Sequence, residues 1–318
     1  MADKPSNAPY YLPDTVQFIE RDWLSSNHVL FTQGDALCIV DTGYKTQSDL
    51  TQAIVAQAIR HCGAKGYLDR ILNTHLHSDH CGGNAALQQQ YPEAKTFIPA
   101  DCAQMVSDWD TEQLTFKATA QDCDPFKFTH TMQDGDQLNL GGYSWQANIA
   151  PGHDHTMLVL YCAQLRTLIS ADALWEDGFG ITFPELEGQS GFKEHRETLH
   201  KLSKLDVAIV LPGHGRLFTD FEGAIARAHS KLDYLMTDPK RHVRLAGKVL
   251  LKFLLLERKI IPIDDLPTIL SNAKLFRNLQ SQLGQSNVHD VVTELVDALC
   301  RAGAARLENK FLYDCDLR

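Results

Sequence analysis

The order of apolar and polar positions predicts strands and helices that alternate in two successive halves. Short apolar runs at residues 16–19, 27–31 and 36–40 are typical of strands, and a turn at 33–35 joins the last two. An amphipathic helix is predicted over residues 48–64, with Leu50, Ile54 and Ile59 facing the core. Later segments are predicted as strands at 68–72, 95–99, 137–140, 143–150, 157–162, 167–170 and 207–211, and as helices at 84–90 and 192–202. This order predicts a layered α/β core with helices on its outer faces.

After Asp220 the pattern becomes mainly helical. Helices are predicted over residues 221–236, 239–257 and 287–302, and the short apolar segments on either side of Asn309 and Lys310 predict a hairpin. We therefore divide the chain into a catalytic domain, residues 1–220, and a helical extension, residues 221–318. The order of elements in the extension is that of a winged helix. Residues 100–130 are irregular, and we interpret them either as a lid beside the site or as an ordinary surface insertion.

The composition limits the possible locations and partners. The chain has 318 residues, 44% of them apolar, and a net charge of −10, which argues against a protein dedicated to nucleic acid. Residues 240–318 carry 13 basic and 9 acidic side chains and so a charge of +4. Residues 1–22 contain no apolar segment typical of a secretory signal, so none is expected. Four charges interrupt the apolar run 249–263, so no membrane span is expected. Eight cysteines without a C-x-x-C pair indicate reduced thiols and a cytoplasmic protein.

Residues 73–84 contain the strongest chemical signal. His75, His77, Asp79 and His80 lie within six positions, and imidazole and carboxylate groups are zinc ligands. If the strand extends to Leu76, His75 and His77 point the same way. Cys81 is expected to be a small packed residue beside these ligands.

Three more candidate ligands each follow a predicted strand. They are His153, Asp172 and His214. Strand ends that meet at one edge of a sheet are where α/β proteins build their sites, so we expect these residues to join the histidine cluster.

With these residues, the chain resembles the metallo-β-lactamase superfamily over about residues 16–219. The resemblance implies a four-layer αβ/βα sandwich with a two-metal site at one edge, and the mainly helical C-terminal extension follows this sandwich in the chain. It also implies that His75, His77 and His153 hold one metal, that Asp79, His80 and His214 hold the other, and that Asp172 bridges them. Asp41 would support the loop that carries the ligands.

This ligand set implies a metal-dependent hydrolase in which a hydroxide shared by two ions attacks the substrate. Asp79 can also accept a proton, which suits acid–base catalysis. Histidine at position 77 favours two zinc ions, with iron and manganese left open.

The bridging Asp172 is typical of the glyoxalase II and lactonase branches, so the predicted substrate is a small ester, thioester or lactone. The alternative is an endoribonuclease or phosphodiesterase whose extension binds RNA, although the basic residues there form no dense block. We expect a small-molecule substrate, no membrane and no nucleic acid, and leave a homodimer open.

Three aromatic residues, Trp175, Phe179 and Phe183, are predicted either to wall the substrate pocket or to pack against the C-terminal helices. Of the remaining histidines, His155 is expected close to the ligands, and His195 is expected on a helix surface.

Overall fold

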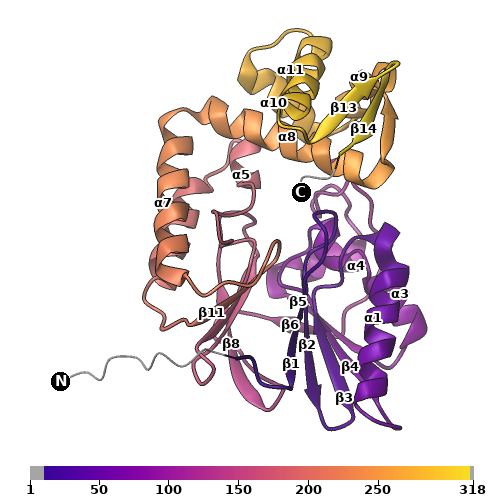
Figure 1. The fold of residues 1–318 in the computed structure, drawn as a ribbon, viewed down its shortest axis with the longest axis vertical. Coiled ribbons are helices and arrows are strands. Elements are labelled where there is room, and N and C mark those ends of the chain that lie inside the picture. The colour runs from indigo at the N-terminus through magenta and orange to yellow at the C-terminus, as the bar shows by residue number, and fades with distance from the viewer. Residues whose placement is uncertain (1–10, 316–318) are drawn as a thin grey trace, which may run out of the picture.

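The computed structural model describes residues 11–315, and two β-sheets form the centre of this part of the chain (Figure 1). The first sheet has the strand order β1-β2-β3-β4-β5-β6. Its strands are β1 (Val16–Ile19), β2 (His28–Gln33), β3 (Ala36–Val40), β4 (Tyr67–Leu72), β5 (Lys95–Pro99) and β6 (His130–Met132). The second sheet has the order β11-β10-β9-β8-β7. Its strands are β7 (Gln137–Leu140), β8 (Tyr143–Ile149), β9 (Leu158–Cys162), β10 (Thr167–Ala171) and β11 (Ile209–Pro212).

Each sheet is mixed, with both parallel and antiparallel neighbours. In the first sheet β3, β4, β5 and β6 run parallel, whereas β1, β2 and β3 are joined as antiparallel neighbours. In the second sheet only β10 and β11 pair in parallel. Parallel strands require crossover connections, and these are the helices that cover the sheets.

Alternation of side chains along the strands creates the layers. Phe31 packs between the two sheets with Trp145, whereas its neighbour Leu30 packs outward against Val55 of helix α1 (Ser48–His61). Helix α3 (Asn84–Gln90) lies beside α1, and helices α6 (Phe192–Leu202) and α7 (Phe221–Thr237) cover the second sheet. The predicted four-layer αβ/βα sandwich is confirmed.

The inward face of α1 differs from the prediction. Thr51, Val55 and Ala58 are its buried residues, Ile54 and Ile59 are half-buried, and Leu50 is 52% exposed. The helix begins at Ser48, as predicted, after a short 3-10 turn, η1 (Lys45–Gln47), so the difference lies in the face that is buried and not in where the helix starts.

Residues 100–130 pack beside the sheet edge. They contain the short helices η2 (Ala100–Cys102) and α4 (Ala103–Asp108), and their side chains Phe116 and Phe126 are buried with Leu76 and Cys81. The segment is thus anchored to the loop that carries the candidate ligands.

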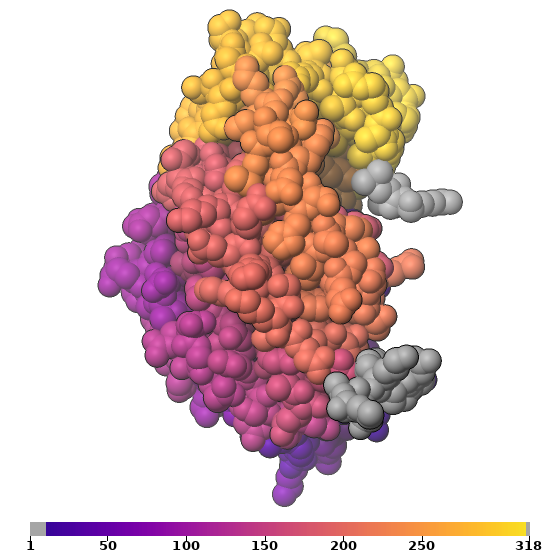
Figure 2. Space-filling model, turned by 90° about the vertical axis from the view of Figure 1, so that its left-hand side faces the viewer, coloured from indigo at the N-terminus to yellow at the C-terminus, as the bar shows by residue number. Residues whose placement is uncertain are grey.

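The C-terminal region covers one end of the sandwich (Figures 1 and 2). Helix α8 (Pro239–Arg258) runs across this end, and a small sheet of order β12-β14-β13 packs on it. The remaining elements are β12 (Ile260–Pro262), η3 (Ile263–Asp265), α9 (Leu266–Asn272), α10 (Lys274–Leu283), α11 (Val288–Arg301), β13 (Ala305–Glu308) and β14 (Phe311–Asp314). The helical extension and its hairpin are confirmed, and the division into two domains at residue 220 stays a prediction.

The apolar stripe of α11 faces α8, and Leu295 lies against Gly247, where an added Cβ would come within 2.9 Å of its side chain. Within residues 11–315, no helix is both long enough and apolar enough to cross a membrane.

Candidate metal centre

The predicted ligands meet at one edge of the two sheets. His153, Asp172 and His214 follow β8, β10 and β11, as expected. Strand β4 ends at Leu72, however, so the expectation that His75 and His77 alternate along a strand is wrong. They lie in the loop 73–77, which leads into the short helix α2 (Ser78–Cys81) with Asp79 and His80.

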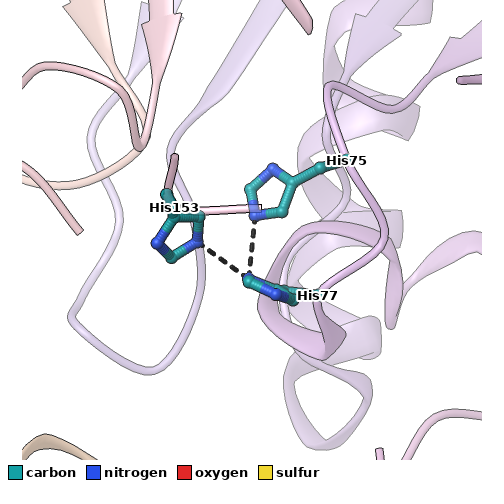
Figure 3. Close-up of side chains that lie close together, drawn as sticks. All are labelled: His75, His77 and His153. Atoms are coloured by element: carbon teal, nitrogen blue, oxygen red, sulfur yellow. Dashed lines mark hydrogen bonds between the residues drawn. The ribbon is translucent and has the colours of Figure 1, made fainter. Parts of the chain in front are cut away.

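Three imidazoles converge in the first group (Figure 3). His77 Nδ1 lies 3.1 Å from His75 Nε2 and 2.8 Å from His153 Nε2. His75 is fully buried, His153 is almost fully buried, and His77 is at the edge of the cavity described below. All three therefore direct a ring nitrogen to one point.

The second group lies directly beside the first. It consists of Asp79, His80 and His214, and His214 Nε2 lies 3.0 Å from Asp79 Oδ2. Asp172 stands between the groups, with its carboxylate oxygens 3.5 Å from His80 Nε2 and 3.4 Å from His153 Nε2. The structure thus brings together all seven predicted ligands.

Neighbouring acceptors fix which ring nitrogen carries a proton. His153 Nδ1 donates to the carbonyl oxygen of Ile181 at 2.6 Å, and His80 Nδ1 donates to Asp41 Oδ2 at 2.8 Å. Nε2 of His153, a ring that burial keeps neutral, is then left with a lone pair that points into the site, and Nε2 of His80 faces Asp172 there. Asp41 also accepts hydrogen bonds from the backbone and hydroxyl of Thr74, so it holds the ligand loop while lying outside the two groups.

Burial and charge favour a cation here. Burial lowers the pKa of His75 well below its ordinary value and that of His153 to about 4, so both rings are neutral at pH 7. Burial opposes ionisation of Asp172, yet His80, His214 and His153 hold its pKa well below the usual range. For His80, burial is outweighed by Asp41, Asp172 and Asp79, which raise its pKa. A neutral imidazole cluster beside ionised buried carboxylates is a donor set that fits metal ions.

One unpaired atom supports the same fit, because His80 Nε2 is buried without a hydrogen-bond partner. The facing ring nitrogens of His75, His77 and His153 lie 2.8–3.1 Å apart, and such nitrogens repel one another unless a proton or a metal ion lies between them. Two glycines make the close approach possible, because a Cβ at Gly213 would lie 2.2 Å from Asp172 Oδ1 and one at Gly180 would lie 2.5 Å from His153 Nδ1.

A cavity of about 230 Å³ opens on these ligands. All three predicted aromatics line it. Trp175 Nε1 donates to Asp172 Oδ1 at 3.2 Å, and the ring of Phe183 meets those of His77 and His153 edge-on. Phe183 also packs against the C-terminal helices. Both predicted alternatives, a wall of the pocket and packing against these helices, therefore apply to Phe183.

Several residues of the cavity were missed by the sequence reasoning. Trp23 is 51% exposed and stacks on the ring of His214. Helix α8 contributes Leu245, Val249, Leu250 and Phe253, and α7 contributes Lys231. The helix over residues 239–257 was predicted, but that prediction does not tell which neighbour the helix covers.

Three further expectations can be compared with the structure. Cys81 is fully buried, as expected. His155 is exposed and bonded to Gln189, and it is Asp154 that approaches His77 Nε2, at 3.7 Å. The placement of His195 on a surface is wrong, because its ring is fully buried against Phe179 and the backbone of Gly152.

Known proteins similar in sequence include several hydrolases. "Probable metallo-hydrolase YqjP" of Bacillus subtilis is 23% identical over 240 residues, which cover 67% of this chain and 74% of that protein. "Beta-lactamase-like protein 2 homolog" of Caenorhabditis elegans is 24% identical over 60% of this chain and 56% of its own length. A hydroxyacylglutathione hydrolase of Idiomarina loihiensis is 30% identical over 49% of this chain, and the match spans about half (47%) of that relative.

Solved structures share the fold. A β-lactamase domain protein from Burkholderia ambifaria matches 96% of this chain and 94% of its own with a TM-score of 0.57 and 17% identity. The B3 metallo-β-lactamase BLEG-1 matches 69% of this chain with a TM-score of 0.54 and 20% identity. The family profile of the metallo-β-lactamase superfamily matches residues 21–214, which include every predicted ligand. This chain therefore belongs to the metallo-β-lactamase superfamily.

Proposed function

We propose that this protein is a metal-dependent hydrolase that uses two metal ions to cleave a small ester, thioester or lactone, with zinc as the preferred metal. The observation that carries the proposal is the convergence of seven nitrogen and oxygen donors at the floor of a cavity whose walls are mainly apolar. His75, His77 and His153 would hold one ion, Asp79, His80 and His214 the other, and Asp172 would bridge them. When bound, the ions would supply Lewis acidity and make water nucleophilic at neutral pH.

The chain's own residues would orient the ligands and manage the proton. Asp79 belongs to the second group and lines the cavity, and its pKa is lowered, because the neighbouring His80 and His214 outweigh the effect of burial. An ionised carboxylate at this position can accept a proton from the attacking water and return it to the leaving group. Trp175 would hold Asp172 in its orientation through the indole N–H.

The walls favour a substrate with an apolar part. The apolar side chains that line the cavity include Trp23, Trp175, Phe183, Leu250 and Phe253. Removing apolar substrate surface from water contributes roughly 25 cal/mol per Å². An acyl chain along α8 would use this surface.

The extension offers little support for the RNA alternative. Four of its basic residues are already paired: Arg241 with Asp238, Arg244 with Glu294, and both Lys252 and Lys259 with Asp314. Side chains engaged with acids are less available to phosphates. We therefore propose that the extension serves as a wall of the substrate cavity.

A hydrolysis panel on metal-loaded protein tests the proposal. It contains S-lactoylglutathione, homoserine lactones of several chain lengths, p-nitrophenyl esters, a phosphodiester and a short single-stranded RNA. Turnover of an ester, thioester or lactone supports the proposed function, whereas cleavage of RNA alone would replace it with nucleic-acid processing.

A further inference from the structure

Lys231 is the one lysine or arginine among the residues of the described chain that line the metal cavity. It projects from α7, which belongs to the C-terminal region, into the cavity that also exposes Asp79, Asp172 and His214. Its aliphatic stem crosses the backbone of Gly178, where an added Cβ would lie 2.7 Å from Lys231 Cδ. The ammonium group is therefore held in place by close packing of its stem.

The ammonium group has only part of its hydrogen-bonding capacity in use. Nζ donates to the carbonyl oxygen of Phe179 at 2.8 Å and lies 4.7 Å from the centre of the Phe179 ring. Within residues 11–315 it pairs with no carboxylate, although an ammonium has three protons to donate. Burial lowers the pKa of Lys231 to about 8, so the group is still mainly charged at pH 7.

A purely structural role would not require this charge. One N–H is enough to hold Phe179, and a neutral donor could do the same. A partly buried cation without a counter-charge costs free energy, and such a cost is typically offset where a ligand supplies the opposite charge.

The position of Lys231 relative to the metal ligands indicates where that charge would lie. Nζ stands 6.0 Å from the centre of the Trp175 ring, and Trp175 Nε1 is bonded to Asp172. The indole ring of Trp175 thus lies between the ammonium group of Lys231 and Asp172, the candidate bridging ligand. An anionic group that reaches Lys231 must be several bonds away from the bond that is cleaved.

We propose that Lys231 binds a carboxylate of the substrate, so that the preferred substrate is an acyl compound with a second, remote carboxylate. The inference rests on the proposed hydrolase function and deepens it. A single ammonium with two spare protons matches a monoanion, whereas phosphate usually requires several cationic or N–H donors. The apolar side chains of α8 would contact the methylene groups between the two ends.

The test compares two esters that differ only in charge. They are the p-nitrophenyl ester of adipic acid with a free second carboxylate and the same ester with that carboxylate methylated. The wild-type protein is expected to prefer the acid by about 10- to 100-fold in kcat/KM, mainly through KM, since this is the range of one hydrogen bond to a charged group. Lys231→Met should abolish the preference, Lys231→Arg should keep part of it, and Lys201→Met, an exposed control in α6, should keep all of it.

Equal hydrolysis of the two esters by the wild type would overturn the proposal. An equal fall in kcat for both esters in Lys231→Met would also overturn it, because the role of Lys231 would then be to hold Phe179. A preference for the corresponding phosphonate would overturn the choice of carboxylate. If neither ester is cleaved, the hydrolysis panel decides the proposed function, and calorimetry with adipate decides the inference separately. Binding of adipate at least about tenfold weaker to Lys231→Met than to the wild type supports it, and equal binding refutes it.

Discussion

His242 Nε2 accepts a hydrogen bond from the backbone N–H of Thr182 at 3.2 Å. The preceding residue, Ile181, accepts the hydrogen bond that orients His153, at 2.6 Å. Because His242 lies in α8, the C-terminal helices are joined to His153, a candidate metal ligand, through only two hydrogen bonds and one peptide unit. The extension therefore supports the candidate metal centre as well as lining its cavity.

Replacing His242 should weaken this connection. In His242→Leu the buried N–H of Thr182 loses its acceptor, which is expected to destabilise the fold by about 1–3 kcal/mol. His242→Gln keeps an acceptor and should lose less. Chemical denaturation at pH 7.5 measures both free energies of unfolding, and equal losses in the two variants would contradict the role given to this hydrogen bond.

The same histidine predicts a dependence of stability on pH. Burial and the nearby Lys231 lower the pKa of His242 from 6.5 to about 4. The unfolded chain therefore binds the proton first, so the stabilising contribution is complete above pH 6.5 and is lost as the pH falls toward 4. It amounts to about 3 kcal/mol. In metal-free protein, the free energy of unfolding should fall more steeply between pH 6.5 and pH 4 for the wild type than for His242→Gln. Parallel curves for the two proteins would contradict this contribution of His242.

Asp41 should affect metal binding without touching the metal. Asp41→Asn removes the charge that His80 Nδ1 faces and is expected to weaken zinc binding about 10- to 100-fold. Competition with a chelating dye measures the affinity, and Asp49→Asn, an exposed change in α1, is the control. An unchanged affinity in Asp41→Asn would show that the ligand loop does not depend on this carboxylate.

Removing a ligand should abolish hydrolysis while the fold remains. His77→Ala and Asp79→Ala are each expected to lower kcat/KM by at least about 100-fold, because metal ions contribute several kcal/mol of charge stabilisation in the transition state. Circular dichroism should remain close to that of the wild type, since both side chains lie at the cavity rather than in an apolar core. Activity near that of the wild type in either variant would remove that residue from the mechanism.

Much of the fold could be predicted because its strands and helices have clear periodicity. The strands around Leu30 and Phe31 and the stripe of α11 follow directly from alternation and helical spacing. The buried face of α1 could not be predicted in this way, because Leu50 and Ile54 adjoin Thr51 and Val55, and both pairs have helical spacing. Neighbouring residues lie about 100° apart around a helix, so burial of Thr51 and Val55 leaves Leu50 exposed.

The ligands could be predicted because histidine and aspartate after strand ends are distinctive. The cavity could not, since Trp23, Lys231 and Val249 lie far apart in the sequence and are ordinary residues for their elements. Their function depends on where α7 and α8 lie relative to the sheet edge, and this is decided by tertiary packing. His195 illustrates the same limit, because its burial depends on the close approach of Gly152.

The most direct test of the central claim is a zinc titration of chelator-stripped protein, with bound metal measured by elemental analysis and hydrolysis of the best substrate measured at each point. The account predicts that activity is absent without metal, rises as metal binds and levels off at about two ions per chain. Full hydrolysis by the metal-free protein would contradict it.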